Sequence, residues 1–167
     1  MGRIGELVSK VKEGRFGFRM DEEMSGEHEF EPGFGEPGRK KMVFRGTWGP
    51  KSIGPWINPR SPEFLTQDIE GAVTVEGLCQ DAPFSGTLAL HYFGEHKLRY
   101  TFEFQAKGKT YRYVGEKVNI RVWNLPVSHT TCYGVLTEKK TGKLVSKSVT
   151  YFRFRKAPSF LASLRLA

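Results

Sequence analysis

Alternation of apolar and polar side chains over HKLRYTFEFQA, residues 96–106, most constrains the fold of this 167-residue chain. Leu98, Tyr100, Phe102 and Phe104 are each separated by one polar residue, so in an extended strand they lie on one face. An α-helix would instead spread these side chains around its axis. The sequence therefore predicts a β-strand with one apolar face.

The same alternation recurs in other segments of the chain, and short turns join the later ones. AKGKT, residues 106–110, and EKKTGK, residues 138–143, have the composition of tight turns between antiparallel strands. Seven or eight strands that pair with their sequence neighbours usually close into a barrel or a two-sheet sandwich. We predict a mainly β fold, an antiparallel up-and-down β-barrel. The expected strands cover residues 41–46, 71–79, 84–93, 96–106, 110–120, 130–139 and 144–156.

Short helices are expected at the N-terminal and C-terminal ends of the chain. The apolar residues between positions 4 and 11 follow helical spacing, and SFLASLRLA, residues 159–167, suits a short helix docked on the barrel. Residues 24–39 are rich in Gly, Pro and Glu and are expected to form a linker or long loop. The predicted division is an N-terminal helix and linker over residues 1–40 and a barrel domain over residues 41–167.

Charge and cysteine content narrow the possible functions. The net charge of +8 comes from residues 41–167, where nineteen Lys and Arg face nine Asp and Glu. Such a surface suits anionic partners, but no RNP-like aromatic motif or zinc finger accompanies it, so nucleic acid binding is not the favoured reading. Two cysteines exclude a disulfide-rich scaffold and a four-cysteine zinc site, and no apolar run reaches the length of a membrane-spanning helix. We expect a reduced, cytoplasmic protein.

The residues predicted to face the barrel interior are large and aromatic. A barrel of about eight strands either fills with such side chains or leaves room for one small ligand. An aromatic lining suits an apolar or amphipathic molecule such as a lipid or sterol. Sequence leaves both possibilities open. The candidate ligand-binding residues in the strands are Tyr100, Phe102, Phe104, Tyr111 and Tyr113.

Several short motifs between residues 64 and 165 occur together. They are a Tyr-rich strand with Tyr100 and Phe102, then Gly115 and Lys117, Trp123, the pair Thr130–Thr131, and finally Phe160 with Leu164. This pattern resembles the lipocalin-like β-barrel module that accompanies some bacterial glucose–methanol–choline oxidoreductases, the cholesterol-oxidase-like flavoproteins, and certain α/β-hydrolases. The resemblance implies a lipocalin-like barrel that serves as accessory module to an oxidoreductase or hydrolase. No Gly-x-Gly-x-x-Gly follows a strand, so neither flavin nor other cofactor is expected here.

The stretch GEKVNIRVWNLPVSHTTC, residues 115–132, collects reactive residue types. His129 and Cys132 could form a catalytic dyad, but a residue spacing of three in extended chain points them to opposite faces. The favoured reading is a structural corner of the barrel. Lys117 and Arg121 are expected as solvated charges at the rim, or alternatively as contacts to an anionic head group. Lys117 and Trp123 complete the set of candidate ligand-binding residues.

The predicted function is a non-enzymatic barrel that binds an apolar or amphipathic small molecule or assists a redox or lipid-modifying enzyme. One alternative is a cofactor-free isomerase or cyclase with an acid/base pair inside the barrel, for which His91, Tyr100 and Glu103 are candidates. A second alternative is binding of nucleic acid or an anionic membrane through the basic surface. No metal site is expected, because HYFGEH, residues 91–96, is read as a hairpin turn.

Overall fold

The computed structural model describes residues 16–120 and 131–152, and isolated positions near the ends of the chain (2, 4–6, 9, 13, 162, 165 and 166). It confirms a mainly β fold, a closed antiparallel barrel of eight strands with a ninth short strand at one edge. Helices are few and short among the described residues: residues 4–6 and 9 are helical, in agreement with the expected N-terminal helix, residue 162 is helical near the C-terminal end, and α2 is Ile53–Ile57.

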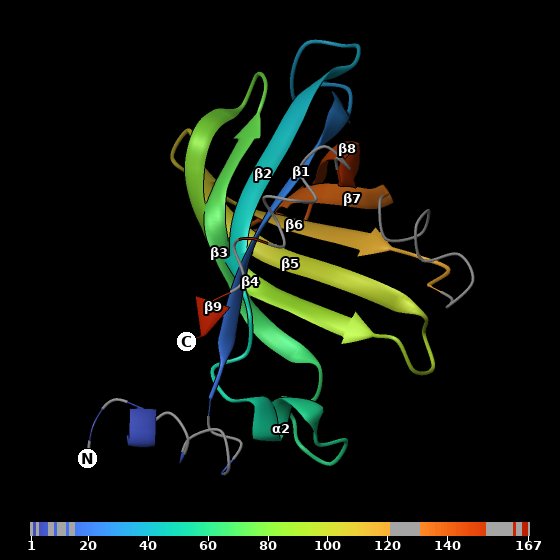
Figure 1. The fold of residues 1–167 in the computed structure, drawn as a ribbon. Helices are drawn as coiled ribbons and strands as arrows, with labels where there is room; N and C mark the ends of the chain where they lie inside the picture. Colours follow the sequence, from blue (N-terminus) through green and yellow to red (C-terminus); the bar gives the residue numbers. More distant parts are fainter. Residues whose placement is uncertain are drawn as a thin grey trace.

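The strands follow one another around the barrel in sequence order (Figure 1). Each strand pairs antiparallel with the next, and β8 returns to β1, which also pairs with β2 and so closes the barrel. β5 to β7 cross β1 and β2 at a steep angle, as the twist of a closed sheet requires. The strands are β1 Phe18–Phe30, β2 Lys40–Trp48, β3 Thr66–Val75, β4 Cys79–His91, β5 Lys97–Ala106, β6 Lys109–Lys117, β7 Thr131–Glu138, β8 Leu144–Phe152 and β9 Arg165–Leu166.

The two longest connections of the barrel, residues 49–65 and 118–130, lie at the same end. At the hairpin end, strands are joined by residues 31–39, 76–78, 107–108 and 139–143. At the long-loop end, residues 49–65 (with α2), 92–96 and 118–130 join the strands, β1 begins and β8 ends. Binding residues tend to lie on longer connections held by a rigid scaffold, so the long-loop end is the natural place to look for a site.

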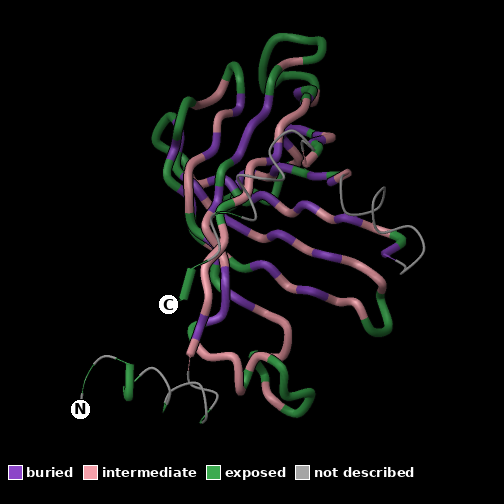
Figure 2. The backbone as a smooth tube through the Cα atoms, viewed as in Figure 1, coloured by how far each residue is buried: buried purple, intermediate pink, exposed green. Residues whose placement is uncertain are grey.

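Side chains that point inward fill the middle of the barrel. Burial alternates residue by residue along the strands (Figure 2), which is the pattern predicted for residues 96–106. The Phe102 ring stacks on Phe84 with centroids 4.0 Å apart and on Tyr113 with centroids 4.7 Å apart. Phe44 packs against Phe102 and Tyr100 at 5.4 and 5.5 Å. This aromatic centre therefore occupies space that a deep ligand pocket would need.

The structure corrects three expectations. The linker predicted over residues 24–39 is wrong as far as Phe30, because β1 includes this part and pairs with both β2 and β8. The strand predicted over residues 71–79 is right as far as Val75, where β3 ends, but residues 76–78 form a tight turn into β4, and Gly77 has a positive φ of 88° there. In the predicted C-terminal helix, Ala162 is helical as expected, but Arg165 and Leu166 form β9 against the start of β1, and the other residues of 159–167 lie outside the described part of the chain.

Candidate functional site

A buried polar cluster lies at the long-loop end of the barrel. Lys117 Nζ is 3.0 Å from Glu22 Oε1, and the Tyr100 hydroxyl donates a hydrogen bond of 2.9 Å to Glu22 Oε2. The Lys117 ammonium also lies 5.4 Å from the centroid of the Tyr100 ring. The side chains of Lys117 and Glu22 are only 4% and 7% exposed. The barrel thus encloses a carboxylate, an ammonium and a phenol in direct contact.

Strand register brings these three side chains together. In β5 and β6, Tyr100 pairs with Gly115 and Leu98 pairs with Lys117, so all four residues point inward. Glu22 belongs to the same inward series as Met24, and its backbone partner is Gly46 of β2. The two glycines opposite them make room for other inward side chains: Ile69 and Phe84 lie beside Gly46, and Tyr113 and Cys132 lie beside Gly115.

Tyr113 and Cys132 extend the polar cluster toward the barrel centre. The Tyr113 hydroxyl and Cys132 Sγ are 3.8 Å apart, and both residues are fully buried. A Cβ at Gly134 would run into the Tyr113 ring, and a Cβ at Gly115 would come within 2.6 Å of the Tyr113 hydroxyl and 2.8 Å of Cys132 Sγ. These two glycines therefore make the room in which the Tyr113 ring lies.

Burial keeps the Tyr100 phenol and the Cys132 thiol protonated. Burial, and then the nearby Glu22 carboxylate, raise the pKa of Tyr100 well above its usual value, so this phenol donates its proton to Glu22 as a hydrogen bond. Burial raises the pKa of Cys132 to about 11, although the Lys117 charge acts in the opposite direction. A thiol with such a pKa is a poor nucleophile at neutral pH, which argues against a catalytic dyad with His129.

Most of the predicted ligand-binding residues are buried inside the barrel. Tyr100, Phe102, Phe104, Tyr111 and Tyr113 all point inward. Tyr100 belongs to the polar cluster and Tyr113 extends it toward the centre, whereas the other three pack among the aromatic residues. Lys117 also points inward. Its expected role as a solvated rim charge is wrong, because the ammonium is buried against Glu22. Trp123, Arg121 and His129 lie outside the described residues.

The residues proposed for an internal acid/base pair do not meet. Glu103 points outward and forms an ion pair with Lys139 at 2.9 Å, and His91 is on the outward face of β4. Only Tyr100 of the three candidates lies in the interior. In the described parts of the chain, no three His, Cys, Asp or Glu side chains gather in a way that would hold a metal ion.

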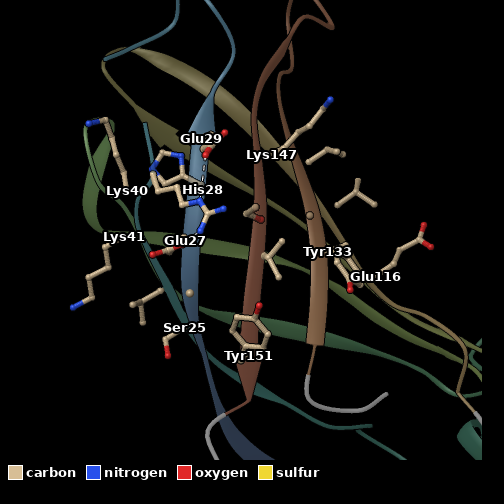
Figure 3. Close-up of a pocket in the computed structure, with 18 of the residues that line it drawn as sticks. Ser25, Glu27, His28, Glu29, Lys40, Lys41, Glu116, Tyr133, Lys147 and Tyr151 are labelled. Atoms are coloured by element: carbon tan, nitrogen blue, oxygen red, sulfur yellow. Dashed lines mark ion pairs between the residues drawn. The ribbon is translucent and has the colours of Figure 1, made fainter. Parts of the chain in front are cut away.

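A groove of about 1360 Å³ runs along the outside of the barrel over β1, β2, β6, β7 and β8 (Figure 3). Tyr133 and Tyr151 contribute exposed rings, while Glu27, Lys41 and Lys147 contribute charges. Several of its charges are paired at the surface, including Arg45 with Glu23 at 2.7 Å, Arg39 with Glu29 at 3.5 Å and Lys147 with Glu31 at 3.7 Å.

The groove and the buried polar cluster do not coincide, since none of Glu22, Tyr100 and Lys117 lines the groove. Exposed ion pairs are commonplace and contribute little to stability. A buried pair requires the removal of two charges from water, a cost that attraction between them only partly returns. We therefore take the polar cluster at the long-loop end as the candidate functional site.

Glu22 was missed in the sequence because its strand was not predicted. The signal was present as alternation, since Met24, Gly26, His28 and Phe30 point inward while the residues between them face outward. The Gly and Glu content of this segment concealed that pattern. His28 was missed for the same reason: it is buried, with Nδ1 accepting from Ser146 Oγ at 2.8 Å and Nε2 donating to the Glu76 carbonyl at 3.0 Å.

Comparisons with models of known protein families, with curated proteins and with solved structures found no match. None of the helices in the described part of the chain is long and apolar enough to cross a membrane. The resemblance to the oxidoreductase-associated barrel module and the cytoplasmic location stay predictions.

Proposed function

We propose that this protein is a non-enzymatic barrel that binds an amphipathic small molecule at its long-loop end. The polar head of the ligand would contact Lys117, Glu22 and Tyr100, and its apolar part would contact the aromatic residues around them. The observation that carries this proposal is the buried ion pair of Lys117 and Glu22. A packed apolar end would stabilise the barrel at least as well, so the pair is best explained by a partner that it recognises.

Aromatic and aliphatic side chains at the long-loop end offer a surface for the apolar part of a ligand. Trp48, Trp56, Leu65, Tyr92 and Phe152 are each partly buried against the core of the barrel. The Trp56 indole is held in place by a hydrogen bond of 2.7 Å from Nε1 to Gln67 Oε1. Burial raises the pKa of Tyr92, and the charge of the nearby Glu22 carboxylate raises it further.

The packed centre limits how deeply a ligand would enter. The rings of Phe44, Phe84 and Phe102 are in mutual contact below the polar cluster. The proposed ligand would therefore lie at the end of the barrel and would not extend along its whole axis. Such a site suits a molecule with one polar group and an apolar body that reaches the loops.

Titration with N-phenyl-1-naphthylamine, an apolar fluorescent probe, tests the proposal. We expect saturable fluorescence enhancement at one site per chain, with affinity weakened about tenfold by Tyr92→Ala or Trp48→Ala, since each loses one large contact. The matched controls Tyr133→Ala and Tyr151→Ala in the outer groove should leave the affinity unchanged. The proposal would be contradicted if only the groove variants lost binding. It would also be contradicted if the probe showed no saturable binding and native mass spectrometry found the protein free of ligand.

A further inference from the structure

We infer that the head group bound at the long-loop end is uncharged and both donates and accepts hydrogen bonds, as the hydroxyl of an alcohol does. This inference rests on the proposed function and specifies the ligand that it would take. It follows from the charge balance and the remaining hydrogen-bonding capacity of the pair formed by Lys117 and Glu22.

Among the residues that the structure describes, the charges of the site cancel. Lys117 and Glu22 are one positive and one negative group, and no other charged side chain in the described residues contacts either of them. Burial keeps the Tyr100 phenol and the Cys132 thiol neutral. A ligand carboxylate or ammonium would therefore add one uncompensated charge to a buried region, which is strongly unfavourable. A neutral head group leaves the balance intact.

With respect to the described residues, the pair also retains a donor and an acceptor beside one another. An ammonium has three N–H groups, and in the described part of the structure Lys117 gives one to Glu22 and faces the Tyr100 ring with another side. A carboxylate has about four acceptor positions. Glu22 receives two hydrogen bonds from described residues, one from Lys117 and one from Tyr100. A hydroxyl would accept from Lys117 and donate to Glu22, which neither a carboxylate nor an ammonium can do.

Three probes with the same ten-carbon chain test the inference: 1-decanol, decanoate and decylamine, each displacing N-phenyl-1-naphthylamine at pH 7.5. With the wild-type protein we expect decanol to bind at least about tenfold more tightly than either charged probe, because only the charged heads create a buried net charge. Equal or tighter binding of decanoate or decylamine would overturn the inference.

Charge variants should change the ranking in opposite directions. Glu22→Gln gives the site a net positive charge, so decanoate should become the tightest of the three probes. Lys117→Met gives it a net negative charge, so decylamine should become the tightest. Lys147→Gln, an exposed charge in the outer groove, is the matched control and should preserve the wild-type ranking. An unchanged ranking in folded Glu22→Gln and Lys117→Met proteins would also overturn the inference.

Failure of the inference and failure of the proposed function give different results. If the naphthylamine probe and all three ten-carbon probes fail to bind, no amphiphile site exists and both ideas fall. If the probes bind but a charged head is preferred, the binding function stands and only the head-group assignment is wrong. Circular dichroism establishes which variants fold, and should neither variant fold, the wild-type ranking decides the question.

Discussion

The centre of the barrel and its long-loop end bury their side chains to a similar degree but with different chemistry. Phe84, Phe102 and Tyr113 stack in the centre, where removal of apolar surface from water stabilises the fold. Glu22 and Lys117 are buried at the end, where desolvation opposes folding. The centre therefore holds the fold together. The long-loop end is less stabilising because it buries two charged groups, and these groups are suited to recognition of a ligand.

The largest test of this comparison is removal of a ring from the centre. Phe102→Ala should lower the free energy of unfolding by about 3–5 kcal/mol, because it leaves a cavity among Phe44, Phe84 and Tyr113. Urea denaturation measures the loss. Tyr133→Ala, which removes an aromatic ring that is 54% exposed, is the control and should cost less than about 1 kcal/mol. Similar losses in the two variants would mean that the centre is not the main source of stability.

The next test breaks the ion pair at the long-loop end. Lys117→Met should lower the free energy of unfolding by about 3 kcal/mol, because it leaves the Glu22 carboxylate buried without its counter-charge. The double variant Glu22→Leu with Lys117→Met should regain wild-type stability or exceed it, since an apolar pair avoids desolvation of charge. Urea denaturation of the two single variants and the double variant gives the coupling. Additive losses would show that the pair is not the costly element that we describe.

Gly134 tests the boundary between the two regions. Gly134→Ala should destabilise the protein by about 2 kcal/mol, because the added methyl group overlaps the Tyr113 ring. The thermal midpoint and urea midpoint report the change. In a Tyr113→Leu background the same substitution should cost clearly less, since the ring that it meets is gone. Equal costs in both backgrounds would refute the explanation by close packing.

His28 at the hairpin end provides the smallest test, as a buried polar group with a partner on each ring nitrogen. Burial lowers its pKa, and Lys40 acts in the same direction, whereas the hydrogen bond and the charge of Glu76 raise it. The unfolded chain therefore takes up this proton first, near pH 6.5, and stability falls as the pH drops below that value.

The expected size of this loss is about 1.4 kcal/mol for each unit by which the pKa is lowered. Urea denaturation of the wild type and His28→Gln between pH 7.5 and 5 measures it, and the difference in slope isolates His28 from the other histidines. Identical slopes would show that His28 contributes nothing to the acid response.

The strands could be predicted where alternation and composition agreed. In β5, large apolar residues alternate with polar ones, so both the strand and its inward face were correctly predicted. In β1 the alternation was present, but inward Gly26 and His28 are not strongly apolar, and the surrounding glutamates indicated a linker. Local patterns therefore reveal a strand best when its inward residues are also hydrophobic.

The candidate site could be predicted only in part. Tyr100 and Lys117 were identified as ligand-binding candidates, but their partner Glu22 was not. Glu22 is 95 positions from Lys117 in the chain, and no local pattern connects the two. A solvated rim position is the usual expectation for a lysine near a strand end. For Lys117 this expectation is wrong, because its ammonium is buried against Glu22.

By itself, the sequence determined the fold class, the sequential antiparallel pairing and the inward faces of β5 and β6, because these depend on backbone geometry and on neighbours along the chain. Only the tertiary structure decided that the aromatic residues fill the centre and that Lys117 is buried with Glu22. These outcomes depend on closure of the barrel through β1, which brings side chains of strands distant in sequence into one enclosed space.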